Sequence, residues 1–187
     1  MKVNGKEALV YYISPTRIDV LAPDDDVTGP VPIVVTNGQN SVAFTAQLAA
    51  YAPGFFLFEP NDRKYVAAVH PDGTRVGPAG LLGGTLTTRP VAVGGRVSLY
   101  GTGFGPTDPF RPANQFLVES ARLPAAAGLE ITIGGVPAAV EFAGMVSNGQ
   151  YQFNVVVPNV AAGDQPVVVK VGGVSSPTGS YLRIGPQ

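Results

Sequence analysis

Gly163-Asp164-Gln165-Pro166-Val167-Val168-Val169 repeats an earlier stretch of the chain, Gly29-Pro30-Val31-Pro32-Ile33-Val34-Val35. Two further blocks recur in the same order: 3–8 is echoed by 133–138, and 18–23 by 153–158. The three offsets, 134, 130 and 135 residues, differ by small loop insertions. Segments rich in Val and Ile that recur in this way predict two tandem β-modules.

Strand patterns continue outward from these blocks. Residues 7–13 are rich in β-formers, 17–21 alternate polar and apolar, and 32–36 end at the hairpin signal Asn37-Gly38 before 41–48 resume. Further strands are predicted at 65–70, 74–76, 95–100, 129–133, 138–142, 151–157, 167–171 and 181–184. We expect a turn at Pro71-Asp72-Gly73, a loop over 79–90 and one weak helical turn over 113–122.

These patterns predict an all-β protein with two tandem immunoglobulin-like β-sandwiches and a central hairpin segment. We place the first unit at 1–52, the connecting hairpin and loop at 53–90, and the second, complete unit at 91–187. The first unit starts directly at its Asn4-Gly5 turn and lacks an opening strand. Because such a gap exposes backbone groups, we hypothesise that Tyr65 to Val69 fills it.

Composition excludes several classes of function. The chain has no Cys, so it has no disulfide or thiolate chemistry, and it carries 12 basic and 13 acidic residues with no basic stripe. Nucleic-acid binding through phosphate neutralisation is therefore not expected. Apolar residues make up 45% of the chain, but no run reaches the roughly 18 residues that a membrane span needs. We expect no membrane insertion.

Five blocks carry a family resemblance: 12–16 (YISPT), 52–56 (APGFF), 101–107 (GTGFGPT), 151–155 (YQFNV) and 163–167 (GDQPV). They resemble an uncharacterised C-terminal domain family of Solibacter-like acidobacteria, found at the end of long exported proteins. Pro90 to Phe104, with its Gly-x-Gly-Phe, and the turn at 133–138 also resemble IPT/TIG immunoglobulin-like domains. The former family has no assigned activity. IPT/TIG domains serve in cell-surface receptors, in transcription-factor dimerisation or DNA contact, and beside glycan-processing modules.

Aromatic residues supply the candidate ligand or junction contacts: Tyr11, Tyr12, Phe55 and Phe56, with Phe58 nearby. They could form a sugar-stacking platform, but the chain has no Trp, so we favour a junction between units for the Phe residues. His70 is the only histidine. One His cannot anchor a typical zinc site, and no nucleophile elbow accompanies it, so we favour a structural or surface role.

Two other motifs have simple interpretations. Asp24-Asp25-Asp26 could contribute oxygens to Ca²⁺, but adjacent side chains diverge and the second copy has Asn159-Val160-Ala161 there, so we favour a solvated loop. Gly101, Gly103 and Gly105 resemble a phosphate loop, but Pro residues follow where a helix would be needed, so we favour a turn. We expect no catalytic residues, no metal site and no cofactor.

The leading functional hypothesis is a non-catalytic module of a secreted or cell-surface protein, used for adhesion, spacing, or glycan or protein binding. We expect the chain to be part of a longer precursor, with a protein or glycan at a cell surface as its partner. The alternative is an accessory domain of a larger polysaccharide-acting enzyme. A standalone hydrolase is disfavoured because the sequence shows no nucleophile–base pair.

Overall fold

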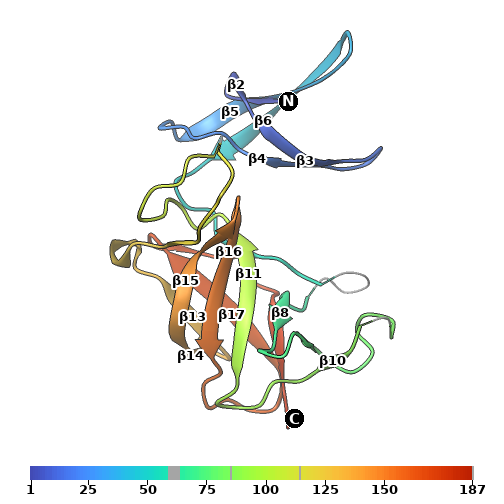
Figure 1. Cartoon of the computed structure of the whole chain (residues 1–187), viewed down its shortest axis with the longest axis vertical. Helices are drawn as coiled ribbons and strands as arrows, with labels where there is room; N and C mark the ends of the chain where they lie inside the picture. The colour runs from blue at the N-terminus through green and yellow to red at the C-terminus, as the bar shows by residue number, and fades with distance from the viewer. Residues whose placement is uncertain (59–63, 85, 114, 187) are drawn as a thin grey trace.

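A computed structural model describes residues 1–58, 64–84, 86–113 and 115–186, and within these ranges the protein is all-β (Figure 1). One three-residue 3₁₀ turn, Ala125–Ala127, is the only helical element described. The expected helical turn over 113–122 is absent from the described part of that range, which instead ends in strand β12 (Ala121–Arg122). Pro112 and Pro124 flank this range, and the residue that precedes a proline is disfavoured in a helical conformation.

The first unit consists of two small sheets. One has the order β2-β1-β5-β6, and the other is the hairpin β3-β4. Their bounds are β1 Lys2–Val3, β2 Lys6–Glu7, β3 Leu9–Ile13, β4 Ile18–Leu21, β5 Gly29–Asn37 and β6 Asn40–Leu48. Asn37 pairs with Asn40 across a two-residue turn that contains Gly38, at φ 60°, which confirms the hairpin predicted there.

The second unit contains two larger sheets that share one core. The first has the order β10-β9-β8-β11-β16-β15-β12, with β7 also paired to β11, and the second has the order β14-β13-β17-β18, with β19 also paired to β17. The bounds are β7 Gly54–Phe55, β8 Ala68–Val69, β9 Arg75–Val76, β10 Thr88–Arg89, β11 Arg96–Thr102, β13 Glu130–Ile133, β14 Val136–Pro137, β15 Ala139–Ser147, β16 Gln150–Val156, β17 Gly163–Val171, β18 Val174–Ser175 and β19 Tyr181–Ile184.

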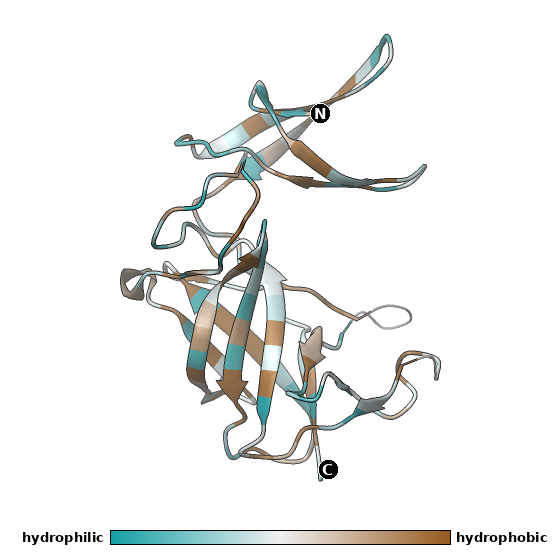
Figure 2. Cartoon of the chain, viewed as in Figure 1, coloured by the Kyte–Doolittle hydropathy of each residue, from teal (hydrophilic) through white to brown (hydrophobic). Residues whose placement is uncertain are grey.

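The core of the second unit lies between these sheets. Leu99, Phe153 and Val155 from one sheet and Ile133 and Val169 from the other are fully buried and belong to one cluster. Alternate residues point inward along β11 and β16, as expected for strands with one face on a core. Figure 2 shows the resulting alternation of apolar and polar positions on these strands. The second unit is therefore sandwich-like.

The two copies share their strand pairing residue by residue. Val3 pairs with Ile33 in the first unit, and Ile133 pairs with Val167 in the second. The hairpins correspond as well: the β3-β4 register shifts between Val10 and Tyr12, and the β15-β16 register shifts between Val140 and Phe142. A bulge at the same point in both hairpins shows that the sequence repeat is a structural repeat.

The connecting segment belongs to the second unit, so the hypothesis that Tyr65 to Val69 fills the gap in the first unit is wrong. Val66 donates its backbone N–H to the Tyr181 carbonyl (3.0 Å), and β8 pairs with β11 through Ala68↔Leu99. The predicted hairpin around 71–73 forms within this segment, through Val69↔Arg75. The expected loop over 79–90 contains β10, which pairs in parallel with β9.

Candidate binding surface

The hairpin β3-β4 places two tyrosines at the surface. Tyr11 and Tyr12 are 49% and 51% exposed, and the guanidinium carbon of Arg17 lies 5.9 Å from the centroid of the Tyr12 ring. Tyr11 occupies the bulge, where the second unit has the exposed Glu141. Residues at a bulge are aimed away from the regular ladder. Both rings are therefore available to a ligand.

The inward side of the first unit is also open. β6 pairs Phe44 with Ile33 and Val42 with Val35, so these apolar side chains share one face of the sheet. Phe44 is 60% exposed, and Ile13 of β3 is 71% exposed. Only Val3 and Val31 are buried among the described apolar residues of 1–48. Figure 2 shows apolar colour along β3.

Sequence reasoning missed Val42, Phe44 and Ile13 as candidate binding residues. The sequence did indicate Val42 and Phe44, because residues 41–48 alternate apolar and polar residues, as expected for a strand with one face on a core. Together with Tyr11 and Tyr12, these three residues make up what we call the first-unit apolar surface, which covers both faces of β3 because the adjacent residues Tyr12 and Ile13 point to opposite sides.

The candidate aromatics from the connecting segment separate in the structure. Phe55 packs into the core of the second unit, with its ring centroid 6.4 Å from Phe104 and 6.3 Å from Phe153. Phe56, next in sequence, points to the other side of its strand and is exposed. Phe55 is therefore a core residue of the second unit rather than a contact between units.

Tyr51 is the aromatic residue where the units join. A Cβ atom at Gly105 or at Gly172 would overlap the Tyr51 ring, so both glycines leave the space that the ring occupies. The next residue, Ala52, donates its backbone N–H to the Gly103 carbonyl (2.9 Å). These contacts fix the end of the first unit against the second.

The same contacts explain the Gly-x-Gly motif. A Cβ atom at Gly101 would meet the Gly54 carbonyl, and one at Gly103, where φ is +81°, would meet the Ala52 carbonyl. Glycine permits both the close backbone approach and the positive φ. The interpretation as a turn agrees with this geometry, and no helix begins directly after the motif within the described residues.

His70 is buried within the connecting hairpin. Its Nε2 lies 3.4 Å from the Arg89 carbonyl, and its backbone N–H donates to the Thr74 carbonyl (2.8 Å). Burial lowers the pKa of His70 below its usual value, in spite of the opposing hydrogen bond to Arg89. Its backbone and ring contacts make it a structural residue of the hairpin.

Two aspartates of the acidic run, Asp24 and Asp25, make different contacts. Asp24 Oδ2 accepts from the Ala113 backbone N–H (2.8 Å), whereas Asp25 Oδ2 accepts from Asn4 Nδ2 (2.8 Å). The Asn4 hydrogen bond is the main cause that lowers the pKa of Asp25, and Lys6 Nζ lies 3.3 Å from Oδ1. Within the described residues, no group of three or more His, Asp or Glu side chains is arranged to hold a metal ion.

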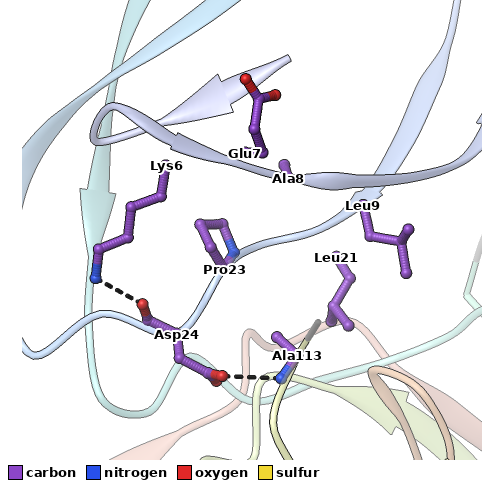
Figure 3. Close-up of a pocket in the computed structure, with 8 residues that line it drawn as sticks. All are labelled: Lys6, Glu7, Ala8, Leu9, Leu21, Pro23, Asp24 and Ala113. Carbon is purple, nitrogen blue, oxygen red and sulfur yellow. Dashed lines mark hydrogen bonds between the residues drawn. The ribbon is translucent and has the colours of Figure 1, made fainter. Parts of the chain in front are cut away.

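One cavity of about 480 Å³ lies where the first unit meets Ala113 of the second. Its apolar wall includes Leu9, Leu21 and Pro23, and its polar groups include Lys6 and Glu7. Figure 3 shows Lys6 donating to the Asp24 carbonyl (2.8 Å), while the Asp24 carboxylate bonds Ala113. These bonds hold the cavity in shape, and its lining has no histidine or hydroxyl nucleophile.

No protein-family model matches the chain, and a search of curated proteins found no match. The resemblance to IPT/TIG domains and to the acidobacterial family therefore stays a prediction. Within the described residues, no helix has the length and apolar character needed to cross a membrane.

Proposed function

We propose that this chain is a non-catalytic binding module of a secreted or cell-surface protein, in which the second unit is a rigid scaffold and the first unit binds the partner. The first-unit apolar surface is the observation that carries the proposal. Tyr11, Tyr12, Ile13, Val42 and Phe44 are all about half exposed or more, although they lie on strands whose second-unit counterparts belong to a folded sandwich. Exposed large apolar side chains concentrated in one unit favour a binding role for that unit.

The scaffold role follows from the contrast in burial between the units. Phe104, Phe153 and Leu99 are fully buried in the second unit, and Tyr51 and Ala52 fasten the first unit to it. A rigid sandwich that presents exposed hairpins is a common arrangement for binding surfaces. The partner is a glycan or protein at a cell surface.

A second candidate function is an accessory domain of a polysaccharide-acting enzyme. The exposed rings of Tyr11 and Tyr12 favour it, because an aromatic face can stack on a sugar ring. The sequence of the complete gene product distinguishes the two: an adjoining glycoside-cleaving domain supports the accessory role, and adhesive or repeat domains support the surface role.

The test compares three forms of the chain on immobilised plant polysaccharides, microbial polysaccharides and bacterial surface proteins. We expect the unchanged chain and Phe116→Ser, which alters an exposed aromatic of the second unit, to bind equally. The double variant Tyr11→Ser/Tyr12→Ser should bind at least tenfold more weakly to the same surface. Equal binding by all three forms would exclude the first-unit surface, and turnover of ester or glycoside substrates by the chain alone would contradict a non-catalytic role.

A further inference from the structure

The large sheet of the second unit has a second face, which points away from the core. Figure 1 shows β15, β16 and β11 side by side, with β17 of the other sheet crossing behind them. Leu99 and Phe153 belong to the core and are fully buried, so the residues next to them, Tyr100 and Gln152, point outward. Both are only partly buried. A ligand can therefore reach this outward face.

The strand register shows which side chains are neighbours on this face. Residues directly opposite each other in an antiparallel pair lie on the same face of the sheet. Tyr100 is opposite Gln152, and Ser98 is opposite Asn154. Phe56 donates its backbone N–H to the Tyr100 carbonyl (2.9 Å) and is 40% exposed, so its ring lies beside Tyr100. These five residues, which we call the amide face, combine two aromatic rings with two amides and a hydroxyl.

Hydrogen bonds orient the two amides. Asn154 Oδ1 accepts from Ser98 Oγ (2.9 Å) and from Gln152 Nε2 (2.7 Å). Because an amide has one acceptor oxygen and one donor nitrogen, these bonds leave Asn154 Nδ2 and Gln152 Oε1 without a partner among the described residues. Arg111 Nε is the only fully buried side-chain N or O atom described without a partner, so the two amide atoms reach the surface. They present a donor and an acceptor to a ligand.

The structural repeat shows that the fold does not require amides here. Asp19 holds the position of Asn154 in the first unit, because each pairs with the residue that follows the bulge of its hairpin. Arg17, two residues earlier, holds the position of Gln152, and its Nε lies 2.6 Å from Asp19 Oδ1. The same two positions therefore carry an ion pair in one copy and an uncharged pair in the other. The second unit has a neutral surface where an ion pair would also fit.

The charged groups lie at the border of the amide face. Arg96 Nε is 2.9 Å from Glu141 Oε1, so these two charges neutralise each other. The guanidinium carbon of Arg122 lies 5.0 Å from the centroid of the Phe142 ring, so it stacks on that ring. A single cation without a basic stripe is a poor match for a polyanion. The charge of the amide face therefore fits a neutral ligand.

We propose that the amide face binds a neutral oligosaccharide. A sugar hydroxyl both donates and accepts, so it can bond Gln152 Oε1 and Asn154 Nδ2, while the apolar face of a sugar ring packs on Tyr100 or Phe56. A peptide is a poorer occupant, because both edges of β16 are already paired and no backbone ladder is open to it. The inference goes beyond the proposed function and does not rest on it, since it gives the second unit a ligand of its own.

The experiment titrates the full chain by calorimetry with four neutral sugars: cellohexaose, xylohexaose, mannohexaose and laminarihexaose. We expect at least one to bind. Tyr100→Ala should weaken binding of that sugar about tenfold or more, whereas Tyr100→Phe, which keeps the ring, should stay within about twofold. Gln39→Ala, at the exposed turn of the β5-β6 hairpin, is the control for substitution of a polar residue and should leave the affinity unchanged.

Asn154→Asp separates binding from stability. An aspartate keeps an oxygen that accepts from Ser98 and Gln152, and Asp19 shows that an acidic residue fits this position of the hairpin. The substitution removes the free N–H donors. We therefore expect an unchanged melting temperature and at least an approximately tenfold loss of sugar affinity. A sugar that binds Asn154→Asp as tightly as the unchanged chain would overturn the proposal.

The remaining outcomes distinguish this inference from the proposed function. If none of the four sugars binds the unchanged chain, the proposal fails. If Tyr11→Ser/Tyr12→Ser abolishes sugar binding while Asn154→Asp retains it, the sugar belongs to the first unit, so the proposed function stands and this inference fails. Loss in Asn154→Asp alone would support the amide face even if the first-unit apolar surface binds nothing. A dimer in sedimentation that Asn154→Asp dissociates would assign the face to a second copy and overturn the proposal.

Discussion

The Phe104 ring packs against the Phe153 ring in a tilted arrangement, with the ring centroids 4.5 Å apart and an interplanar angle of 60°. Phe104 comes from the Gly-x-Gly-Phe turn after β11 and Phe153 from β16, and both side chains are fully buried. The Phe153 counterpart in the first unit, Ile18, is only half buried. This pair therefore marks the difference between a closed unit and an open one.

Replacing Phe104 by Ala should destabilise the second unit by about 3–5 kcal/mol, because it removes a buried ring and leaves a cavity beside Phe153 and Tyr151. Urea denaturation followed by tyrosine fluorescence would measure the loss. Phe116→Ala is the matched control, since Phe116 is 80% exposed, and it should change stability by less than about 0.5 kcal/mol. Equal effects of the two substitutions would contradict this assignment.

Gly103→Ala should destabilise the chain by more than Gly73→Ala. Both glycines have positive φ, +81° and +85°, so both substitutions carry a strain of about 1 kcal/mol or more. Only at Gly103 would the new Cβ also meet a backbone atom, the Ala52 carbonyl, whereas the space at Gly73 is open. Thermal unfolding of the two variants under the same conditions would measure the difference, and identical melting temperatures would refute it.

The connecting hairpin should lose stability in acid through Asp72. The Thr74 backbone N–H and the Arg89 guanidinium, 2.7 Å away, lower the pKa of Asp72 from 3.8 to about 2. A carboxylate whose pKa is lower in the folded state contributes stability above pH 3.8, and that contribution is lost as the pH falls from 3.8 through about 2. NMR titration of the carboxyl group would give the pKa directly.

Variants separate the two causes of this shift. Arg89→Gln should raise the pKa of Asp72 toward 3.8 but leave part of the shift, because the Thr74 N–H remains. Asp72→Asn should remove the acid-dependent component of stability between pH 4 and pH 2 that is specific to this site. An unchanged pH profile in Asp72→Asn would show that other carboxylates account for the acid sensitivity.

Hydrogen exchange should distinguish the two units. Amides of β11 and β16, which lie inside the eight-stranded sheet, should exchange slowly, and amides of β3 and β4 should exchange quickly. The reason is that the first unit buries only Val3 and Val31 among its described apolar side chains, so opening it exposes little additional surface. Mass-spectrometric exchange of peptides from 9–21, 96–102 and 150–156 would test this, and equal protection would contradict an open first unit.

Much of the fold could be predicted from local sequence patterns. The repeated block at 29–35 and 163–169 became β5 and β17, whose bounds correspond over nine residues each, Gly29–Asn37 and Gly163–Val171. The hairpins at Asn37-Gly38 and Pro71-Asp72-Gly73 also formed as predicted. Alternating apolar residues and turn residues act over a few positions, so they determine strands and hairpins without reference to the rest of the chain.

The candidate site was less predictable. Tyr11 and Tyr12 were named from their residue type, but the bulge that aims Tyr11 outward and the exposure of Phe44 appeared only in the folded structure. Phe55 and Phe56 looked equivalent in the sequence, yet one entered the core and the other remained at the surface. Successive strand residues face opposite sides, and only the pairing of β7 with β11 decided which side was buried.

The sequence by itself predicted that the chain is all-β and that its strand blocks repeat, and the structure shows both. Tertiary structure alone decided where the central segment pairs: Tyr65 to Val69 joined the second unit and left the edge of β4 open. A strand can add to any exposed edge through the same backbone hydrogen bonds, so local pattern does not choose between edges. The choice depends on which core the side chains enter, as Val66 and Ala68 do when they are buried against the second unit.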